Sequence, residues 1–504
     1  MLDNILKKLF LTLLGSAFLI LSFPKFNVFF LAFISFIPIF YVIKKSSLME
    51  TLIYGFLFAF LFVFGSLEWL YYAGNYARLT TNMKISIGFF IILYFTFPFI
   101  LFFFLLWFFY RLKITFMHIL ILSSMWVSLE FLFTTLLIQF PWLLLGYSQY
   151  NNPYIIQISE ITGVYGISFL IVFINFLLFK MIFSEKGRGT TFLVISILLI
   201  LLFFYDYLRI KNFSSSETIK VAIVQEKFPQ DSEWWNPSGF KNAMGNFENF
   251  SIKARELGAK IVIWPEGSIP FSLQFGGELK EILFMIQKNI GVPVLFGGIE
   301  FNRESNNFFN TAFLLYNGKI IGKYRKQKPA PLGEYLPNSL FPLKNYLLHI
   351  SSIDRGEISN SLGIGGLSFG VYICGEAIFP NLVRNFPRNG AEFLVNITND
   401  SVLEKHKGFE QHFMHSIFRA VENRRWVIRC STIGISGFVS PTGRIISKTI
   451  LFEKTFMIED IELIKEKTFY SKYGDIFSWI CSGFFFISMI FMIFLKRKNY
   501  AKIK

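Results

Sequence analysis

The chain has 504 residues, of which 53% are hydrophobic, 19% aromatic and only 16% charged, and its formal net charge is +16. Because a soluble globular protein carries roughly 25% charged residues, this composition, with a mean hydropathy of +0.50, argues against an ordinary soluble protein and predicts an integral membrane protein. Most basic residues outside the soluble region lie in short loops between apolar segments, a pattern typical of membrane topology. We therefore expect no nucleic-acid partner.

A helix needs roughly 20 apolar residues to cross a bilayer. Candidate spans lie near residues 9–23, 27–43, 51–72, 85–110, 114–139, 164–183, 191–208 and 474–495. We expect a transmembrane bundle of about seven helices at 1–210 and a C-terminal transmembrane helix at 474–495. Glu130 falls inside the fifth span, where it is either a functional residue or a carboxyl group hydrogen-bonded within the bundle.

The loop charges predict which side of the membrane the soluble region occupies. With the N-terminus in the cytoplasm, roughly fourteen basic residues lie on the cytoplasmic side and about three in the short outside loops. Seven spans then carry the chain outward, and the eighth returns it. The region at 215–470 is therefore expected to be extracytoplasmic.

Strand-like and helix-like runs alternate through 215–470, which predicts an α/β sheet with helices on its faces. Helices are expected at about 237–258, 278–290 and 407–424. Paired runs around Asn317-Gly318 indicate a hairpin, so the sheet should be mixed. The loops are unusually apolar, as at Trp234 and Trp235. Loops of this kind either enter the lipid interface, line a slot for an acyl chain, or pack against the rest of the domain as ordinary loops do.

Three reactive side chains stand at or near the ends of strand-like runs, namely Glu266, Lys326 and Cys374. A thiol is a poor nucleophile until it loses its proton. We therefore predict Cys374 as nucleophile, Glu266 as general base, and Lys326 as the group that holds the ion pair and stabilises an oxyanion. Glu334 is expected to fix the Lys326 ammonium, and Glu376 to line the same pocket. The plain alternatives are a buried thiol, a helix-start acid and a solvated lysine.

Other chemistries have weaker support. The chain has no G-x-S-x-G motif and no Gly-rich phosphate loop before a helix. His406, His412 and His415 share one helical stretch but lack the H-E-x-x-H pattern, so we expect this helix to pack against the domain and no metal site to form. Cys430 is expected in the core, and no disulfide framework is expected.

The stretches around the three reactive residues resemble the nitrilase superfamily, whose fold is an αββα sandwich with a Glu-Lys-Cys triad. With the flanking spans, the chain resembles the apolipoprotein N-acyltransferases of bacteria with outer membranes. The motifs that carry the resemblance are FPWLLLGYSQ, GVYGISFLIVFIN, VIWPEGSIP, KYRKQKPAPLGEYLP, ICGE, NITND and FYSKYGD. The resemblance implies an α-helical transmembrane bundle plus an α/β nitrilase-like αββα sandwich domain at 215–470.

The chain departs from the family pattern beside the expected pocket. Gly375 stands where the family usually has an aromatic residue between Cys and Glu, and Ser401 to Leu403 replace Trp-Phe-Gly after Asn-Asp. Altered lipid preference, altered lipoprotein preference and reduced activity are the alternatives that these changes raise. We expect Trp234, Gly375 and Asn399 to bind substrate.

The resemblance implies a reaction in two halves. Cys374 attacks an acyl ester of a phospholipid, phosphatidylethanolamine as in the family, and a thioester forms. The α-amine of the diacylglyceryl-cysteine of an apolipoprotein then attacks the thioester. We expect a monomer in the bacterial inner membrane, with a periplasmic catalytic domain and no cofactor. A membrane-tethered nitrilase-like amidase and a non-catalytic lipid-handling protein remain the alternatives.

Overall fold

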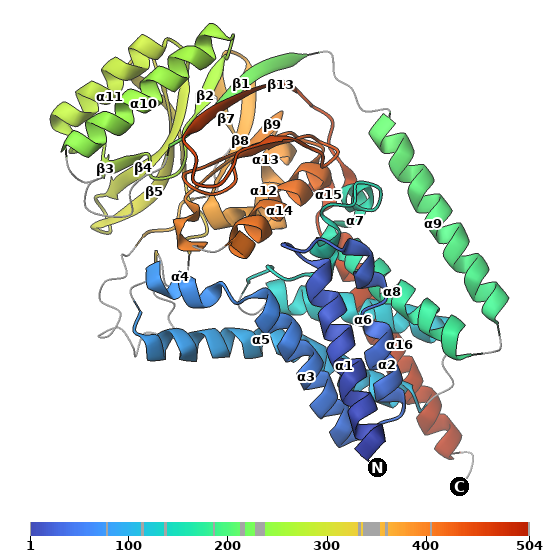
Figure 1. Ribbon diagram of the computed structural model, residues 1–504. Helices are drawn as coiled ribbons and strands as arrows, with labels where there is room; N and C mark the ends of the chain where they lie inside the picture. The colour runs from blue at the N-terminus through green and yellow to red at the C-terminus, as the bar shows by residue number, and fades with distance from the viewer. Residues whose placement is uncertain are drawn as a thin grey trace. The chain divides into compact units, whose positions relative to one another are not determined.

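The computed structural model describes residues 2–76, 79–111, 115–135, 139–184, 187–211, 217–226, 237–330, 334–335, 353–357, 361–403 and 406–501. The chain divides into two compact units. The helical unit comprises Met1–Glu68, Ile85–Lys211 and Tyr473–Lys504, and the α/β unit comprises Trp69–Lys84 and Asn212–Lys472. Figure 1 labels their helices and strands.

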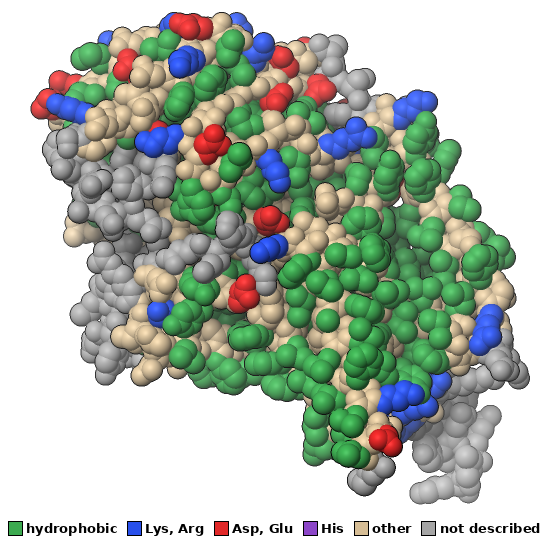
Figure 2. All heavy atoms as spheres, viewed as in Figure 1, with side chains coloured by type: hydrophobic (Ala, Val, Ile, Leu, Met, Phe, Trp, Pro, Cys, Tyr) green, Lys and Arg blue, Asp and Glu red, His purple; other side chains and the backbone are tan. Residues whose placement is uncertain are grey.

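Among the described residues, seven helices are long and apolar enough to cross a membrane. They are α1 (Leu2–Ser22), α3 (Leu48–Ser66), α5 (Thr81–Phe109), α6 (Phe116–Thr135), α8 (Val164–Phe183), α9 (Arg188–Lys211) and α16 (Ile476–Ala501). Large apolar side chains such as Phe90, Ile200 and Ile487 are 65–70% exposed on these helices, and Figure 2 shows apolar side chains covering much of the surface in this part of the chain. Such faces suit contact with lipid, which confirms the expected helical transmembrane part of the fold.

The expected span at residues 27–43 is interrupted, because these residues do not form one continuous helix. They form a 3-10 turn, η1 (Phe29–Phe33), and then a nine-residue helix, α2 (Phe36–Lys44). Asn175 of α8 forms hydrogen bonds with two backbone groups at this break. Its Oδ1 accepts the N–H of Phe36 at 2.9 Å, and its Nδ2 donates to the carbonyl of Ala32 at 2.9 Å. Both backbone groups would otherwise be unpaired in an apolar environment.

The third helix is shorter than the expected span at 51–72. A capping box starts α3, in which Ser47 and Glu50 each bond the other's backbone N–H, and α3 ends at Ser66. The next helix, α4 (Leu70–Tyr76), belongs to the α/β unit. The remaining short elements of the helical unit are η2 (Leu145–Gln149), η3 (Ile156–Ile158) and α7 (Ser159–Thr162).

Glu130 lies buried on α6 within the helical unit. Its Oε1 accepts the N–H of Leu145 at 2.8 Å. Of the two interpretations that the sequence left open, this contact supports a carboxyl group that joins parts of the bundle by hydrogen bonding.

The α/β unit contains two mixed sheets. The first runs in the order β13-β1-β2-β4-β5-β6, with β3 paired to β4, and the second in the order β12-β11-β10-β9-β8-β7. The strands of the first are β1 (Thr218–Gln225), β2 (Ile261–Ile263), β3 (Ile269–Ser272), β4 (Val294–Asn302), β5 (Asn307–Tyr316), β6 (Lys319–Arg325) and β13 (Thr455–Glu462). Those of the second are β7 (Leu362–Ile364), β8 (Leu367–Ile373), β9 (Phe393–Thr398), β10 (Val427–Ser431), β11 (Gly437–Val439) and β12 (Ile445–Lys448).

Helices cover the outer faces of both sheets (Figure 1). The first sheet packs against α10 (Pro237–Glu256) and α11 (Gly277–Ile290) in one apolar core. Within it, Phe247 stacks on Trp264 with ring centroids 4.5 Å apart, and burial of one such ring stabilises the fold by about 2–3 kcal/mol. The helices of the second sheet are α12 (Pro380–Val383), α13 (Asn385–Arg388) and α14 (His406–Asn423), and the last short elements are η5 (Cys374–Ile378), η6 (Asp400–Leu403) and α15 (Phe469–Tyr473).

The two sheets meet in the middle of the unit. The buried thiol of Cys430, on β10, lies 3.4 Å from the carbonyl oxygens of Val224 and Ile263, which belong to the first sheet. Cys430 is thus a core residue, as expected. The layers follow the order helix, sheet, sheet, helix, which confirms the expected αββα sandwich.

Candidate active site

Glu266 is held rigidly just beyond the end of β2. A Cβ atom at Gly297 of β4 would lie 2.6 Å from its Cα, so only glycine allows this close approach. The Glu266 side chain accepts hydrogen bonds at both oxygens. Asn310 Nδ2 donates to Oε1 and the backbone N–H of Asn399 donates to Oε2, each at 2.7 Å.

Lys326 follows β6 and is only 1% exposed. Its Nζ lies 2.8 Å from Glu334 Oε2 and 3.4 Å from Glu266 Oε1. The same Nδ2 of Asn310 also donates to Glu334 Oε1 at 2.7 Å. Burial by itself lowers the pKa of Lys326, but the neighbouring carboxylates Glu266 and Glu334 raise it well above its ordinary value. The lysine therefore stays charged.

The two carboxylates beside this ammonium differ in proton affinity. Burial raises the pKa of Glu266, and the opposing effect of Lys326 does not cancel the increase. Burial also acts to raise the pKa of Glu334, but its shorter contact with Lys326 outweighs this and the pKa is lowered. Glu334 is thus the counter-ion of Lys326, while Glu266 is the group suited to exchanging a proton.

Cys374 follows β8 with a backbone φ of +52°. This left-handed conformation costs a non-glycine residue about 1–3 kcal/mol, so it persists only where the surroundings enforce it. Burial, and secondly the charge of Glu266, raise the pKa of the Cys374 thiol to about 12, although Lys326 acts in the opposite direction. The resting thiol is therefore protonated and needs a base before it can attack.

Glu376 joins the segment that follows Lys326 to the strand that precedes Cys374. Its two oxygens accept four hydrogen bonds, and burial raises its pKa to about 7. The donors are Tyr324 Oη (2.9 Å), Gln327 N (2.6 Å), Lys328 N (3.0 Å) and Ile373 N (2.7 Å). Its oxygens thus join the segments of the chain that lead to Lys326 and Cys374.

The residues expected to bind substrate differ in what the structure describes. Trp234 lies outside the described residues. A Cβ atom added to Gly375 would have no described atom within 4 Å. The side-chain oxygen of Asn399 accepts hydrogen bonds from Ser401 (2.7 Å from Oγ) and Thr432 (2.9 Å). Substrate contact by these residues stays a prediction.

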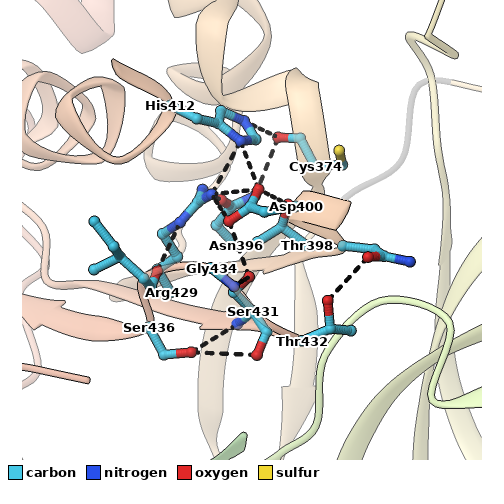
Figure 3. Close-up of polar contacts among 12 residues, drawn as sticks. Cys374, Asn396, Thr398, Asp400, His412, Arg429, Ser431, Thr432, Gly434 and Ser436 are labelled. Carbon is cyan, nitrogen blue, oxygen red and sulfur yellow. Dashed lines mark hydrogen bonds and ion pairs between the residues drawn. The ribbon is translucent and has the colours of Figure 1, made fainter. Parts of the chain in front are cut away.

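Sequence reasoning did not single out Asn310, which bonds both carboxylates of the site. Its position in a strand of alternating residues gave no signal, because its partners lie 24 and 44 residues away in sequence. It also missed a buried polar cluster behind Cys374, centred on Asp400, Arg429 and His412 (Figure 3). The helix that carries His412 does pack against the domain, as expected.

Two family models match the chain in consecutive regions. Residues 220–467 match the carbon-nitrogen hydrolase model, in agreement with the two-sheet sandwich. This match defines the class of the α/β unit. Residues 15–177 match the apolipoprotein N-acyltransferase N-terminal domain.

Curated relatives narrow the class to one family. An apolipoprotein N-acyltransferase of Geobacter metallireducens is 33% identical over 369 residues, 71% of each chain. The apolipoprotein N-acyltransferase 1 of Treponema denticola is 27% identical over 552 residues, 97% of this chain and 98% of that protein. The chain belongs to the apolipoprotein N-acyltransferase family. Among solved structures, an amidase from Nesterenkonia sp. aligns with 49% of this chain and 91% of its own at 17% identity and a TM-score of 0.38.

Proposed function

We propose that the protein transfers an acyl chain from a membrane phospholipid, through a thioester on Cys374, to the α-amine of the diacylglyceryl-cysteine of an apolipoprotein. The observation that carries the proposal is the cluster in which Lys326 contacts both Glu266 and Glu334, and the charges of Glu266 and Lys326 act on the pKa of the Cys374 thiol. The relatives named for this activity support the choice of substrates.

In the first half-reaction, the Cys374 sulfur bonds to the ester carbonyl carbon of the phospholipid while the thiol proton passes to Glu266. The Lys326 ammonium donates to the oxyanion that forms. When this intermediate collapses, the ester C–O bond breaks. Glu266 returns the proton to the departing oxygen, lysophospholipid leaves, and Cys374 carries the acyl group as a thioester.

In the second half-reaction, the neutral α-amine of the apolipoprotein attacks the thioester carbonyl carbon. Glu266 takes a proton from the nitrogen, and Lys326 again stabilises the oxyanion. The C–S bond breaks, the sulfur regains a proton from Glu266, and the acceptor leaves as an N-acyl amide. Throughout, Glu334 keeps the ammonium in place, which leaves Glu266 free to exchange protons.

The proposal also covers the acyl donor, the oligomeric state and the membrane location. Phosphatidylethanolamine is the acyl donor and the enzyme acts as a monomer without a cofactor. The protein crosses the bacterial inner membrane several times, and its catalytic domain is on the periplasmic side. The excess of basic residues in the expected cytoplasmic loops supports this orientation.

Acceptor choice distinguishes this proposal from a membrane-tethered amidase. Purified protein is incubated with phosphatidylethanolamine and a diacylglyceryl-peptide that has either a free or an acetylated α-amine. Mass spectrometry should detect one additional acyl chain on the free-amine peptide, an equal amount of lysophospholipid, and neither product with Cys374→Ala. Release of fatty acid at the same rate with both peptides would identify water as the acceptor and contradict the proposal.

A further inference from the structure

The main-chain carbonyl oxygen of Cys374 is held by two side chains from elsewhere in the fold. His412 Nε2 of α14 lies 3.3 Å from this oxygen, and Asn396 Nδ2 of β9 donates to it at 3.4 Å. Asn396 Nδ2 also donates to the carbonyl of Tyr372 at 3.1 Å. The strained residue that carries the thiol is thus fixed through its backbone by the neighbouring strand and by the covering helix.

We propose that His412 is a positioning residue, which keeps the left-handed backbone of Cys374, and with it the thiol, in the reactive arrangement through the carbonyl oxygen. The inference rests on the proposed function only for the reaction that the thiol performs. His412 itself touches no reacting atom.

A buried ion pair orients both side chains that reach this carbonyl. Arg429 Nη2 lies 2.9 and 2.8 Å from the two carboxylate oxygens of Asp400. Asp400 Oδ1 is 2.8 Å from His412 Nδ1. Arg429 Nη1 donates to the side-chain oxygen of Asn396. Asp400 and Arg429 are 0% exposed and His412 is 3% exposed, so the cluster is held without solvent.

Further contacts fix the carboxylate itself. Thr398 Oγ1 donates to Asp400 Oδ1 at 3.0 Å, and Ser431 Oγ donates to Asp400 Oδ2 at 2.9 Å. A Cβ atom at Gly434 would lie 2.0 Å from Asp400 Oδ2. Only glycine therefore lets the backbone pass this close to the carboxylate. These contacts hold Asp400 in one position. Asp400 in turn orients the ring of His412, which it contacts.

The geometry argues against His412 as a general base for the thiol. Figure 3 shows that the ring is directed at the carbonyl oxygen of Cys374, while the sulfur points away from it. Burial, and secondly the charge of Arg429, lower the pKa of His412. A neutral ring that donates to the carbonyl carries its proton on Nε2, and its Nδ1 then accepts a hydrogen bond from Arg429 Nη2, which lies 3.0 Å away.

Two conservative substitutions test the contact with the carbonyl separately from the contact with Asp400. In His412→Gln the terminal amide nitrogen reaches about as far as Nε2, whereas in His412→Asn it reaches only about as far as Nδ1. Asparagine keeps a polar group at the Nδ1 position toward Asp400 and loses the donor to the Cys374 carbonyl, whereas glutamine restores that donor and gives up the contact at the Nδ1 position. The matched control is His415→Asn, because His415 is another fully buried histidine of α14, one turn further along the helix.

The readout is the rate at which iodoacetamide alkylates Cys374 in the full-length protein, located by mass spectrometry of the peptide that contains Cys374. Since displacement of a reactive group by about 1 Å costs on the order of 100-fold in rate, we expect alkylation to fall at least about tenfold in His412→Asn. We expect His412→Gln and His415→Asn to stay within about threefold of the wild type. For the acyl donor, His412→Asn should lower kcat and leave KM unchanged.

The inference is overturned if His412→Asn alkylates as fast as the wild type, or if all three variants slow equally, which would indicate a purely structural role for buried histidines of α14. Alkylation needs neither lipid nor acceptor. A selective loss in His412→Asn together with no acyl transfer by the wild type would therefore refute the proposed function while upholding the positioning role.

Discussion

At the scale of single residues, Asn310 links the two carboxylates of the site. One Nδ2 donates to both Glu266 Oε1 and Glu334 Oε1 at 2.7 Å. Hydrogen bonds to the ionised form of a carboxyl group favour that form, and Asn310 accordingly acts to lower the pKa of Glu266, against the larger effect of burial. Asn310 thereby helps to keep the proposed base ionised.

Replacement of Asn310 by alanine should raise the pKa of Glu266 further. The base is active when ionised, so the acidic limb of the rate of acyl transfer against pH should move to higher pH. A net hydrogen bond of about 1 kcal/mol corresponds to roughly 0.7 pH units. Asn307→Ala is the matched control, because Asn307 lies on the same strand and donates to Asp354 instead. An unshifted acidic limb in Asn310→Ala would contradict the assignment of Glu266 as the base.

The sequence indicated the three proposed catalytic residues because each lies at or near the end of a strand-like run and because their order resembles the Glu-Lys-Cys triad of the nitrilase superfamily. The residues that orient them could not be found in this way. His412, Asn310 and Glu376 reach their partners across turns of the chain, and several of their contacts are with backbone atoms, which leave no trace in the residue pattern. Glu376 was expected in the pocket, which stays a prediction, and the hydrogen bonds that its oxygens accept from the surrounding backbone were not foreseen.

Substitution of Glu376 by glutamine should therefore disturb the segments of the chain that position Lys326 and Cys374. Both oxygens face donors, so an amide NH₂ in place of one oxygen leaves buried donors unpaired, at a cost of about 1–3 kcal/mol each. We expect a lower thermal unfolding temperature and slower alkylation of Cys374. An unchanged unfolding temperature would show that these hydrogen bonds do not support the fold.

At the scale of elements, alternation of strand-like and helix-like runs was sufficient to predict a mixed sheet with covering helices, whereas the two-sheet sandwich was expected only from the family resemblance. Helices expected at about 237–258, 278–290 and 407–424 occur as α10, α11 and α14, within two residues at each end. The interruption between η1 and α2 was not predictable in the same way. Residues 27–43 are apolar enough for a single helix, and the residue that accommodates the break, Asn175, is 139 residues away from Phe36.

Asn175→Leu tests this explanation of the broken helix. The substitution removes the partners of the Phe36 N–H and the Ala32 carbonyl in an apolar environment, so we expect the free energy of unfolding in detergent to fall by about 2–4 kcal/mol. Lys180→Ala on the same helix is the control and should change it by no more than about 0.5 kcal/mol. Equal effects of the two substitutions would contradict the structural role of Asn175.

At the scale of the whole molecule, the proposed reaction requires the α/β unit to face the periplasm. Glu304 is exposed in the α/β unit and Lys45 is exposed in a loop expected to be cytoplasmic. In a Cys374→Ala background, a membrane-impermeant maleimide should label Glu304→Cys in intact spheroplasts and label Lys45→Cys only after lysis. The opposite pattern would invert the proposed topology and place the site away from its lipoprotein substrates.

In the proposed reaction, Cys374 carries the acyl chain between two lipid-anchored substrates. The most direct measurement is to incubate the purified protein with phosphatidylethanolamine that has a labelled acyl chain, and then to treat it with neutral hydroxylamine. We expect label on the wild-type protein that hydroxylamine removes, no label on Cys374→Ala, and transfer of the label to an added diacylglyceryl-peptide. Absence of label on the wild type, with no lysophospholipid released, would contradict a Cys374 thioester formed from this donor.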